Sequence, residues 1–474
     1  MMRRNGTLQS VSMEVKTLNM GVPMRWSATL SFQQLVSYAS RKGLIYLVFQ
    51  TSKARLCTLP AGIKGLILRT NMLPSSAQVS GLQMLSSILL IRAGATAAQI
   101  IPEIAKSAAH LTVCQRTPGF VIPRHDHELP QWERLLRSYF PPLRNRIRAE
   151  AMNFRELFHK AVTQADSPYA ALMRQMNDGL LQKQLAHRPD LQEKVKPRYN
   201  PGCKRTVISN DYYPTLARDN VDLETAKIER ITESGIKFEG IDQVKQLDVL
   251  ILATGFDTFN FLGGLQISGL NGQKLDEIWP EGVAKALKGI MIPNIPNFGM
   301  LYGPNTNLSH NSLILVIEAQ ARHLAAMINT IFTIRNEIHD VGGRSLAIWP
   351  KQEVTEQYWT KLQEKLQNTS FADPSCTSWW RRHDGTIVNN WPGTAVEYQR
   401  LLEEIKWRDF DAMGTAAQEF NEYMVSKKGV QIVPRVVEEA WLSRGALTAI
   451  AVAGVVVGVS LLRIWRQTSP LRTR

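Results

Sequence analysis

The first hundred residues of this chain are almost without acidic side chains. They hold eleven Lys and Arg residues but a single acid, Glu14, whereas the other 374 residues hold 45 basic and 40 acidic residues. The net charge of +15 therefore comes mainly from one end of the chain. Because nucleic-acid binding needs Lys and Arg clustered on one face of a fold, we expect no nucleic-acid partner.

Cysteine is also scarce. The four cysteines, Cys57, Cys114, Cys203 and Cys376, lie far apart, form no CxxC pair and have no His spacing suited to zinc. This pattern predicts reduced thiols in a protein that faces the cytosol, and no metal site. Cys203 has no base or metal ligand nearby in sequence, so we expect it to be chemically inert.

Residues 1–85 lack a GxGxxG turn after a strand, which is the phosphate-binding motif of a dinucleotide-binding domain. Apolar and polar residues are mixed there without a helical or alternating period. We expect an atypical basic segment that is poorly ordered or a remnant. A mitochondrial targeting segment, an alternative N-terminus and a misread coding region all remain open.

The stretch Leu247–Phe259, LDVLILATGFDTF, is the centre of the remaining chain. Its apolar run Val249–Ala253 predicts a buried parallel strand, and Thr254-Gly255 predicts a sharp turn after it. Ligands bind at the carboxyl ends of strands in open α/β sheets. An ordinary core strand that ends in a glycine turn is the simpler alternative.

A strand–turn–helix–strand unit is predicted over 86–114. Ile88–Ile91 has the pattern of a short strand, 97–107 has helical spacing, and His110–Cys114 supplies the next strand. The small residues between the first strand and the helix would let backbone N–H groups face a phosphate. The Gln115-Arg116-Thr117 turn then follows the second strand, where a guanidinium is suited to bidentate phosphate contact.

Two further regions complete the pattern. Residues 128–193 are rich in helix formers with helical apolar spacing, broken at Pro141-Pro142. Asn307 or Ser309, in the stretch GPNTNLSHNS, could cap a helix that starts at Asn311.

Five stretches, taken in this order, resemble flavin-dependent monooxygenases of the Baeyer–Villiger type: GATAAQIIPEIA, QRTPGFVIPR, PGCKR, DVLILATGFD and GPNTNLSHNS. The resemblance covers roughly residues 88–425. It implies an α/β fold with the Rossmann-like, two-dinucleotide-binding-domain architecture of these flavoproteins, here with the FAD domain incomplete. In the family's second glycine turn, usually GxGAxAxQ, Arg92 stands where the first glycine would be.

The resemblance also implies domains and site residues. The domains are an NADPH-binding domain over 86–256 with a helical insertion at 128–193, and the C-terminal part of an FAD and substrate domain over 257–425. The resemblance makes Arg205 the catalytic arginine beside the flavin. It assigns cofactor binding to Gly94, Ala95, Thr96, Gln99, Arg116, Thr117, Lys204, Thr254, Gly255, Asn307 and Trp379, with Arg116 and Lys204 on the ribose 2′-phosphate of NADPH.

The implied activity is an FAD- and NADPH-dependent monooxygenation through a peroxyflavin. One oxygen atom of O₂ would be inserted next to a ketone, or would be added to a heteroatom of a small-molecule substrate. The missing flavin GxGxxG motif leaves a second hypothesis open, in which the chain is a catalytically inactive, membrane-anchored dinucleotide-binding remnant of the family.

The end of the chain holds an uncharged run of 18 residues, Gly445–Leu462. Its length is enough to span a bilayer, and Trp441 and Trp465 stand at its two edges, where interfacial tryptophans are common. A buried core helix is the alternative. We expect a linker at 426–444 and a single-pass membrane anchor, with the bulk of the chain in the cytosol.

Overall fold

The computed structural model describes residues 87–91, 94–124, 126–232, 234–253, 258–262, 265–336, 345–436, 452–454 and 456–461, and three earlier strands of two residues each. The chain divides into a larger unit, 1–126 with 158–435, and a smaller unit, 127–157 with 436–474. Arg92 and the predicted turn Thr254-Gly255 lie outside the described residues.

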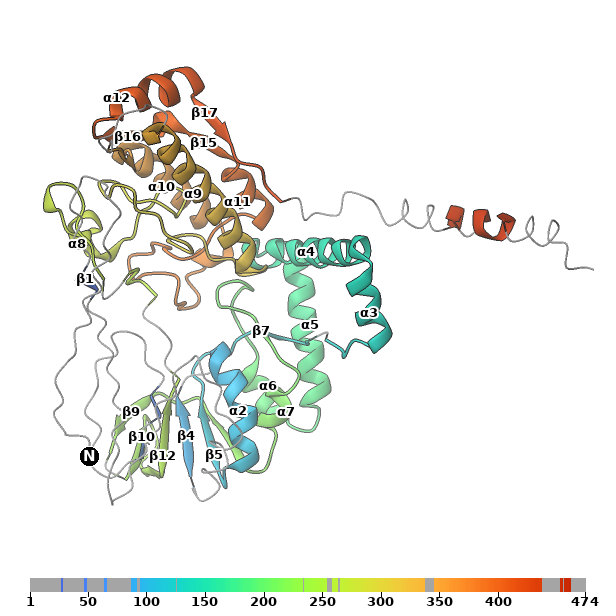
Figure 1. Cartoon of the computed structure of the whole chain (residues 1–474). Helices are drawn as coiled ribbons and strands as arrows, with labels where there is room; N and C mark the ends of the chain where they lie inside the picture. The colour runs from blue at the N-terminus through green and yellow to red at the C-terminus, as the bar shows by residue number, and fades with distance from the viewer. Residues whose placement is uncertain are drawn as a thin grey trace, which may run out of the picture. The chain divides into compact units, whose positions relative to one another are not determined.

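A parallel sheet organises the first half of the larger unit (Figure 1). Its strands are β4 (Ile88–Ile91), β5 (Leu111–Cys114), β8 (Val221–Glu224) and β12 (Val249–Leu252), in the order β12-β4-β5-β8. Two short strands, β2 (Leu47–Val48) and β3 (Lys64–Gly65), also pair with β12. The strands predicted at 88–91, 110–114 and 248–253 are therefore confirmed, with ends that differ by at most one residue.

Both faces of this sheet are covered, which explains why its strands are apolar without alternation. One face packs against α2 (Ala95–Ser107), α5 (Pro168–Gln184), α6 (Pro189–Val195) and α7 (Tyr212–Leu216), and Ile88, Leu90 and Val113 point into that core. The opposite face, with Leu89 and Leu250, packs against an antiparallel sheet. That sheet consists of β9 (Ile228–Ile231), β10 (Gly235–Phe238) and β11 (Lys245–Gln246).

Helices dominate the segment between the paired strands β6 (Val121–Ile122) and β7 (Val207–Ile208). They are α3 (Gln131–Tyr139), α4 (Pro141–Thr163), α5 (Pro168–Gln184) and α6 (Pro189–Val195), and α7 (Tyr212–Leu216) follows β7. Pro141, predicted as a break, is the first residue of α4. Proline is tolerated there because the first helical N–H groups have no partner within the helix.

The rest of the larger unit carries α9 (Leu313–Asn336) and α10 (Gln352–Gln367) as its long helices. Short elements surround them: β13 (Leu265–Gln266, paired with β1, Ser27–Ala28), η1 (Leu270–Gly272), α8 (Leu275–Ile278), η2 (Pro280–Gly282), β14 (Ala347–Pro350), η3 (Ser370–Ala372), α11 (Ala395–Leu401), β15 (Glu404–Lys406), η4 (Trp407–Asp409), β16 (Phe410–Met413), α12 (Ala417–Phe420), η5 (Asn421–Lys428) and β17 (Val430–Ile432). β14 pairs with β16 and β15 pairs with β17.

The start of α9 differs from the prediction. The helix begins at Leu313, and the Ser312 hydroxyl accepts a hydrogen bond from Ile314 N at 3.3 Å, as an N-cap does. Asn307 and Ser309 lie too far upstream to cap it. Several Ser and Asn residues in one stretch can each cap a helix, and the sequence does not show which one the packing selects.

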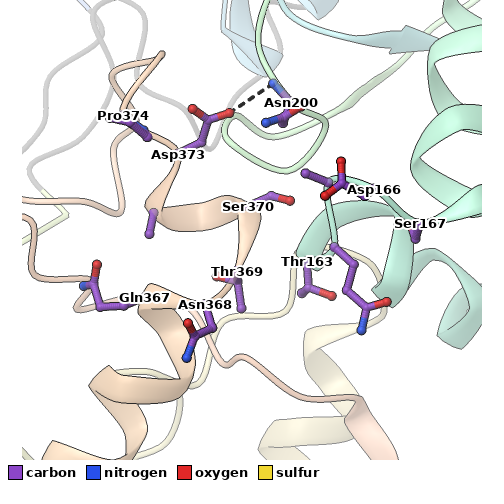
Figure 2. Close-up of a pocket in the computed structure, with 13 residues that line it drawn as sticks. Thr163, Asp166, Ser167, Asn200, Gln367, Asn368, Thr369, Ser370, Asp373 and Pro374 are labelled. Carbon is purple, nitrogen blue, oxygen red and sulfur yellow. Dashed lines mark hydrogen bonds between the residues drawn. The ribbon is translucent and has the colours of Figure 1, made fainter.

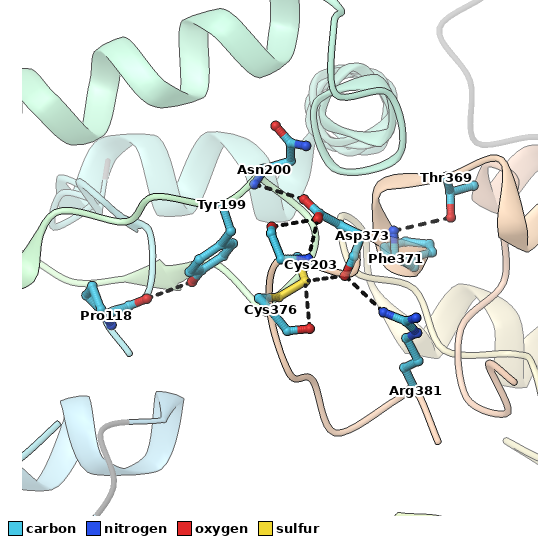
Figure 3. Close-up of a disulfide and its surroundings, with 10 residues drawn as sticks. Pro118, Tyr199, Asn200, Cys203, Thr369, Phe371, Asp373, Cys376 and Arg381 are labelled. Carbon is cyan, nitrogen blue, oxygen red and sulfur yellow. Dashed lines mark hydrogen bonds between the residues drawn. A yellow bond between two sulfur atoms is a disulfide. The ribbon is translucent and has the colours of Figure 1, made fainter. Parts of the chain in front are cut away.

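The prediction of four reduced cysteines is wrong for two of them. Cys203 and Cys376 form a disulfide, although 173 positions separate them along the chain (Figure 3). Their Cα atoms lie 6.4 Å apart, within the range that a disulfide spans. Only the folded chain brings them together, so their spacing carries no signal of the pairing. Cys114 is free and buried, and burial raises the pKa of its thiol to about 12.

The predicted membrane-spanning run Gly445–Leu462 overlaps the described residues only at 452–454 and 456–461. Within the parts of the chain that the structure describes, we find no helix with the length and apolar character needed to cross a bilayer. The rest of the predicted run lies outside the described residues, so the anchor stays a prediction.

His323 on α9 provides a test of this packing. Its side chain is 1% exposed and its Nδ1–H donates to Leu402 O at 2.8 Å. Burial, together with the nearby charge of Lys288, lowers the pKa of His323 to about 3. The unfolded chain therefore binds a proton below about pH 6.5 that the folded chain rejects, so folding stability falls as the pH drops.

We expect His323→Gln to remove this loss, because Gln can still donate to Leu402 O but does not titrate. Urea unfolding at about pH 7.5 and about pH 5 should show the wild type losing roughly 2 kcal/mol more than the variant between the two pH values. Equal losses in both proteins would contradict the assignment.

Candidate functional site

The N-terminus of α2, which follows β4, is open at its first residues. Gly94 is the N-cap of α2, with no side-chain cap, and a Cβ built on it would meet nothing within 4 Å. Ala95 and Thr96 are half-buried in the first turn of the helix, and Gln99 is exposed one turn later. The first N–H groups of a helix have no partner within it, so this end can receive an anion.

The turn after β5 lies at the same edge of the sheet. β4 and β5 are parallel with Ile91 opposite Cys114, so the chain leaves both strands side by side. Arg116 is exposed and Thr117 half-buried in the turn that follows. β12 also ends at this edge, with Leu252 opposite Ile91. The chain runs from β4 to β5 on one side and returns to β12 on the other, which makes this the topological switch point where ligands bind.

Tyr212 anchors the Arg116 turn, a role that sequence analysis missed. Its hydroxyl donates to Gln115 Oε1 at 2.8 Å, and Gln115 N donates to Glu224 O at 2.9 Å. Burial raises the pKa of the Tyr212 phenol, so it remains a protonated donor. The sequence signal was the buried-type Tyr pair after PGCKR, but its partner lies 97 residues upstream.

The PGCKR loop lies beside the same turn. Lys204 Nζ is 5.6 Å from the centre of the Tyr199 ring, and the Tyr199 hydroxyl donates to Pro118 O at 2.8 Å. Gly202 has a φ of +97°, and a Cβ there would lie 1.9 Å from Val162 O, so only glycine fits. The loop is therefore held close to the chain that follows Arg116 and Thr117.

Arg205, the next residue, is exposed. Its charge affects the pKa of Tyr302, which belongs to the second half of the unit. Burial raises the pKa of the Tyr302 phenol, and the nearby charge of Arg205 lowers it in part. Tyr302 has a left-handed backbone, φ +57°, and its N–H donates to Gln320 Oε1 at 2.7 Å. This residue was not singled out from the sequence, because its link to Arg205 exists only in the folded chain.

Asn307 has its side chain in internal hydrogen bonds. It is 3% exposed, its Oδ1 accepts from the Tyr302 hydroxyl at 3.0 Å, and its Nδ2 donates to Asn390 Oδ1 at 2.6 Å. Its backbone N donates to Asn389 O at 2.9 Å. The hydrogen bonds of Asn307 therefore connect the 302–307 segment to the 389–391 segment.

Trp379 is 38% exposed, whereas Trp380, in edge contact with it at 5.2 Å, is fully buried. Trp379 O accepts a hydrogen bond from the Thr258 hydroxyl. Thr258 is the first described residue after the turn that ends β12. The backbone of the exposed tryptophan thus lies next to Thr258, while the side chain of Trp380 belongs to the core.

The two halves are joined covalently beside these residues. The Cys203–Cys376 bridge links the residue before Lys204 to the segment that leads to Trp379 (Figure 3). Asn200 N also donates to Asp373 Oδ2 at 3.2 Å. The structure therefore joins the loop of Lys204 and Arg205 to the segment that carries Trp379.

A cavity of about 680 Å³ is lined in part by Asn200 and Asp373, whose hydrogen bond Figure 2 shows. Its lining is polar and apolar in about equal parts and comes mainly from the end of α4, the start of α5 and the segment around η3: Thr163, Gln164, Ala165, Asp166, Ser167, Asn200, Gln367, Asn368, Thr369, Ser370, Ala372, Asp373 and Pro374. None of the predicted site residues is among them. The candidate site is thus distinct from this cavity.

Comparison with known proteins agrees with this geometry. No family model matches the chain. The FAD-binding monooxygenase ktnD of Aspergillus niger is 38% identical over 379 residues, which cover 79% of this chain and 59% of that protein. A Baeyer–Villiger monooxygenase of Streptomyces coelicolor is 30% identical over 332 residues, 69% of this chain and 61% of that protein.

The chain belongs to the family of Baeyer–Villiger-type monooxygenases. It spans about three fifths of the length of these two relatives.

Solved structures of Baeyer–Villiger-type monooxygenases show the same α/β fold. OTEMO in complex with FAD and NADP superposes with a TM-score of 0.60 at 21% identity, covering 77% of this chain and 74% of that one. Cyclohexanone monooxygenase from Rhodococcus sp. Phi1 bound to NADP⁺ gives a TM-score of 0.58 at 19% identity, covering 83% and 72%.

Tyr212→Phe tests the anchor of the Arg116 turn. It leaves the buried Gln115 Oε1 without the donor it has now, which should cost about 1–3 kcal/mol of folding stability. Tyr213→Phe is the matched control, because the Tyr213 hydroxyl donates to Asn177 Oδ1, and that atom keeps a second donor, Val121 N at 2.9 Å. The control should cost only about 1 kcal/mol. Urea unfolding of both variants measures the difference, and a larger loss for Tyr213→Phe would contradict the assignment.

Proposed function

We propose that the chain is an FAD- and NADPH-dependent monooxygenase that inserts one oxygen atom of O₂ next to a ketone, or adds it to a heteroatom. The proposal is supported by the similarity to proteins named FAD-binding and Baeyer–Villiger monooxygenases. The observation that carries it is that the turns of Gly94 and Arg116 leave the same edge of the sheet, with Lys204 held beside the Arg116 turn by Tyr199.

The sheet edge is the proposed NADPH site. Its pyrophosphate would lie on the N-terminus of α2, where Gly94, Ala95 and Thr96 leave open backbone N–H groups and Gln99 follows. The 2′-phosphate would meet two cations, Arg116 with its neighbour Thr117 after β5, and Lys204 beside Tyr199. The open space at Gly94 and the exposure of Arg116 fit this ligand.

The proposed reaction site consists of Arg205, Tyr302, Asn307 and Trp379. FAD, when bound, supplies the oxygen-activating chemistry. Arg205 would hold negative charge that develops on oxygen, because a guanidinium held near that oxygen stabilises an anion. Asn307 would position Tyr302 beside it, and Trp379 would line the cleft for cofactor and substrate. Thr254 and Gly255 are proposed to approach the cofactor from the end of β12.

The domain assignment belongs to the same proposal. Residues 86–256 form the NADPH-binding domain with its helical insertion at 128–193. Residues 257–425 form the C-terminal part of the FAD and substrate domain, and 426–444 form a linker.

Binding of two small nucleotides tests the NADPH site without any turnover. We expect the chain to bind 2′,5′-ADP, and Arg116→Ala and Lys204→Ala each to weaken it by roughly tenfold or more, because each removes a charge-assisted contact. Affinity for 5′-AMP, which lacks the 2′-phosphate, should stay unchanged. Isothermal titration calorimetry gives both constants. Equal losses for the two nucleotides would count against a 2′-phosphate role.

The absorbance of the purified chain with added FAD, between about 350 and 500 nm, tests the activity. We expect a flavin spectrum that NADPH bleaches, and oxygenated product from a ketone substrate. Arg205→Ala should keep the bleaching but lower product formation by about a hundredfold or more. Arg198→Ala, which alters an exposed arginine paired with Glu193 in the preceding segment, is the matched control and should leave both unchanged.

A protein that rejects FAD and stays colourless would refute the monooxygenase proposal. The outcome would favour the inactive, dinucleotide-binding relative. Equal product formation by Arg205→Ala and the wild type would refute the role of Arg205 alone.

A further inference from the structure

We propose that the Cys203–Cys376 disulfide is a positioning element of the site: it fixes Lys204 and Arg205 against the segment that carries Trp379, and its reduction by a dithiol releases them. The roles of Lys204, Arg205 and Trp379 rest on the proposed function. The tether itself rests on the contacts of the folded chain.

The position of the bridge in the sequence gives it this effect. Cys203 directly precedes Lys204 and Arg205, and Cys376 stands three residues before Trp379. Consecutive Cα atoms are 3.8 Å apart, so a cross-link at Cys203 limits how far the next two residues can move. One bond therefore restrains cations and tryptophan on segments 173 positions apart.

The contacts around the bridge point the same way. Cys203 is fully buried and Cys376 is 8% exposed, and they pack with Phe120 and Tyr199 in a cluster of four buried residues. Tyr199 is the residue whose ring lies under Lys204 and whose hydroxyl holds Pro118. The bridge thus lies at the centre of the contacts that place Lys204 beside the Arg116 turn.

Asp373 reinforces the tether from the C-terminal side. Its carboxylate accepts from Asn200 N at 3.2 Å and from Ser375 N at 2.8 Å, and its carbonyl accepts from Arg381 Nη1 at 3.1 Å (Figure 3). These hydrogen bonds hold 373–381 in shape, and the bond from Asn200 N crosses to the loop of Cys203. A cross-link that spans a long loop adds far more restraint than one such bond.

Reduction is a balanced thiol exchange. A dithiol supplies two electrons and two protons, the sulfur–sulfur bond of Cys203 and Cys376 breaks, two thiols form, and the dithiol becomes a disulfide. The attacking thiolate would reach Cys376, because it is the more exposed of the two. The buried cluster then has no covalent bond to hold the Lys204–Arg205 loop to 373–379.

Peptide mapping and hydrogen exchange test the tether without relying on cofactor binding. We expect digestion of the alkylated, unreduced full chain to yield one cross-linked peptide pair containing Cys203 and Cys376. Reduction by dithiothreitol, or Cys203→Ala with Cys376→Ala, should raise amide exchange in peptides covering 199–208 and 373–382 by about tenfold and leave α2 unchanged. Cys114→Ala, which removes a free buried cysteine, is the matched control. Two alkylated thiols in the unreduced protein, or unchanged exchange after reduction, would overturn the proposal.

Nucleotide selectivity separates positioning from general loosening. Loss of the bridge should weaken 2′,5′-ADP by about tenfold, since Lys204 loses its place, and leave 5′-AMP unchanged. Oxidation of the reduced wild type back to the bridged form should restore the affinity. Equal weakening of both nucleotides would show a merely structural bridge. Failure of the bridged wild type to bind 2′,5′-ADP would refute the proposed NADPH site, and the exchange data would still decide the tether.

Discussion

In a parallel sheet every strand ends at the same edge, and the candidate site depends on this constraint. β12, β4 and β5 are paired in register, with Leu252, Ile91 and Cys114 as their last paired residues. The chain leaves all three strands at one edge, and the turns of Gly94 and Arg116 lie there side by side as a consequence. No long-range contact between the motifs is needed to bring them together, because the backbone hydrogen bonds of the sheet do it.

This edge was predictable because it follows from local patterns. The apolar runs at 88–91 and 249–253, the small-residue turn at Gly94 and the helical spacing after it are each visible in a few residues. Both sheet faces are covered, so the strands are continuous apolar runs. Their short length between turn residues distinguishes them from a helix. These local patterns are therefore sufficient to place Gly94 and Arg116 at the same edge.

The second layer of the site was not predictable, since it depends on pairs distant in sequence. Tyr212 reaches Gln115 across 97 positions, Asn307 reaches Asn390 across 83, and Cys203 reaches Cys376 across 173. A single Tyr, Asn or Cys gives no sign of which partner it will meet. The motif marked Asn307 for a ligand, and in the folded chain its amide also bonds to Tyr302 and Asn390. The cysteines show an error of this kind, because their spacing suggested free thiols.

Lys204 and Arg205 show why this second layer matters. They are adjacent, yet Lys204 lies over Tyr199, which holds Pro118 after the Arg116 turn, while Arg205 acts on Tyr302 from the other half of the unit. One short loop thus supplies cations to two different partners. The position of this loop has to be fixed, because movement toward Tyr199 or toward Tyr302 would move it away from the other. Two residues immediately before the cations fix the loop. Gly202 packs so closely on Val162 O that no other residue fits there, and Cys203 is bound to Cys376. In the order Gly-Cys-Lys-Arg, two residues that fix the backbone therefore directly precede the two cations whose positions depend on it.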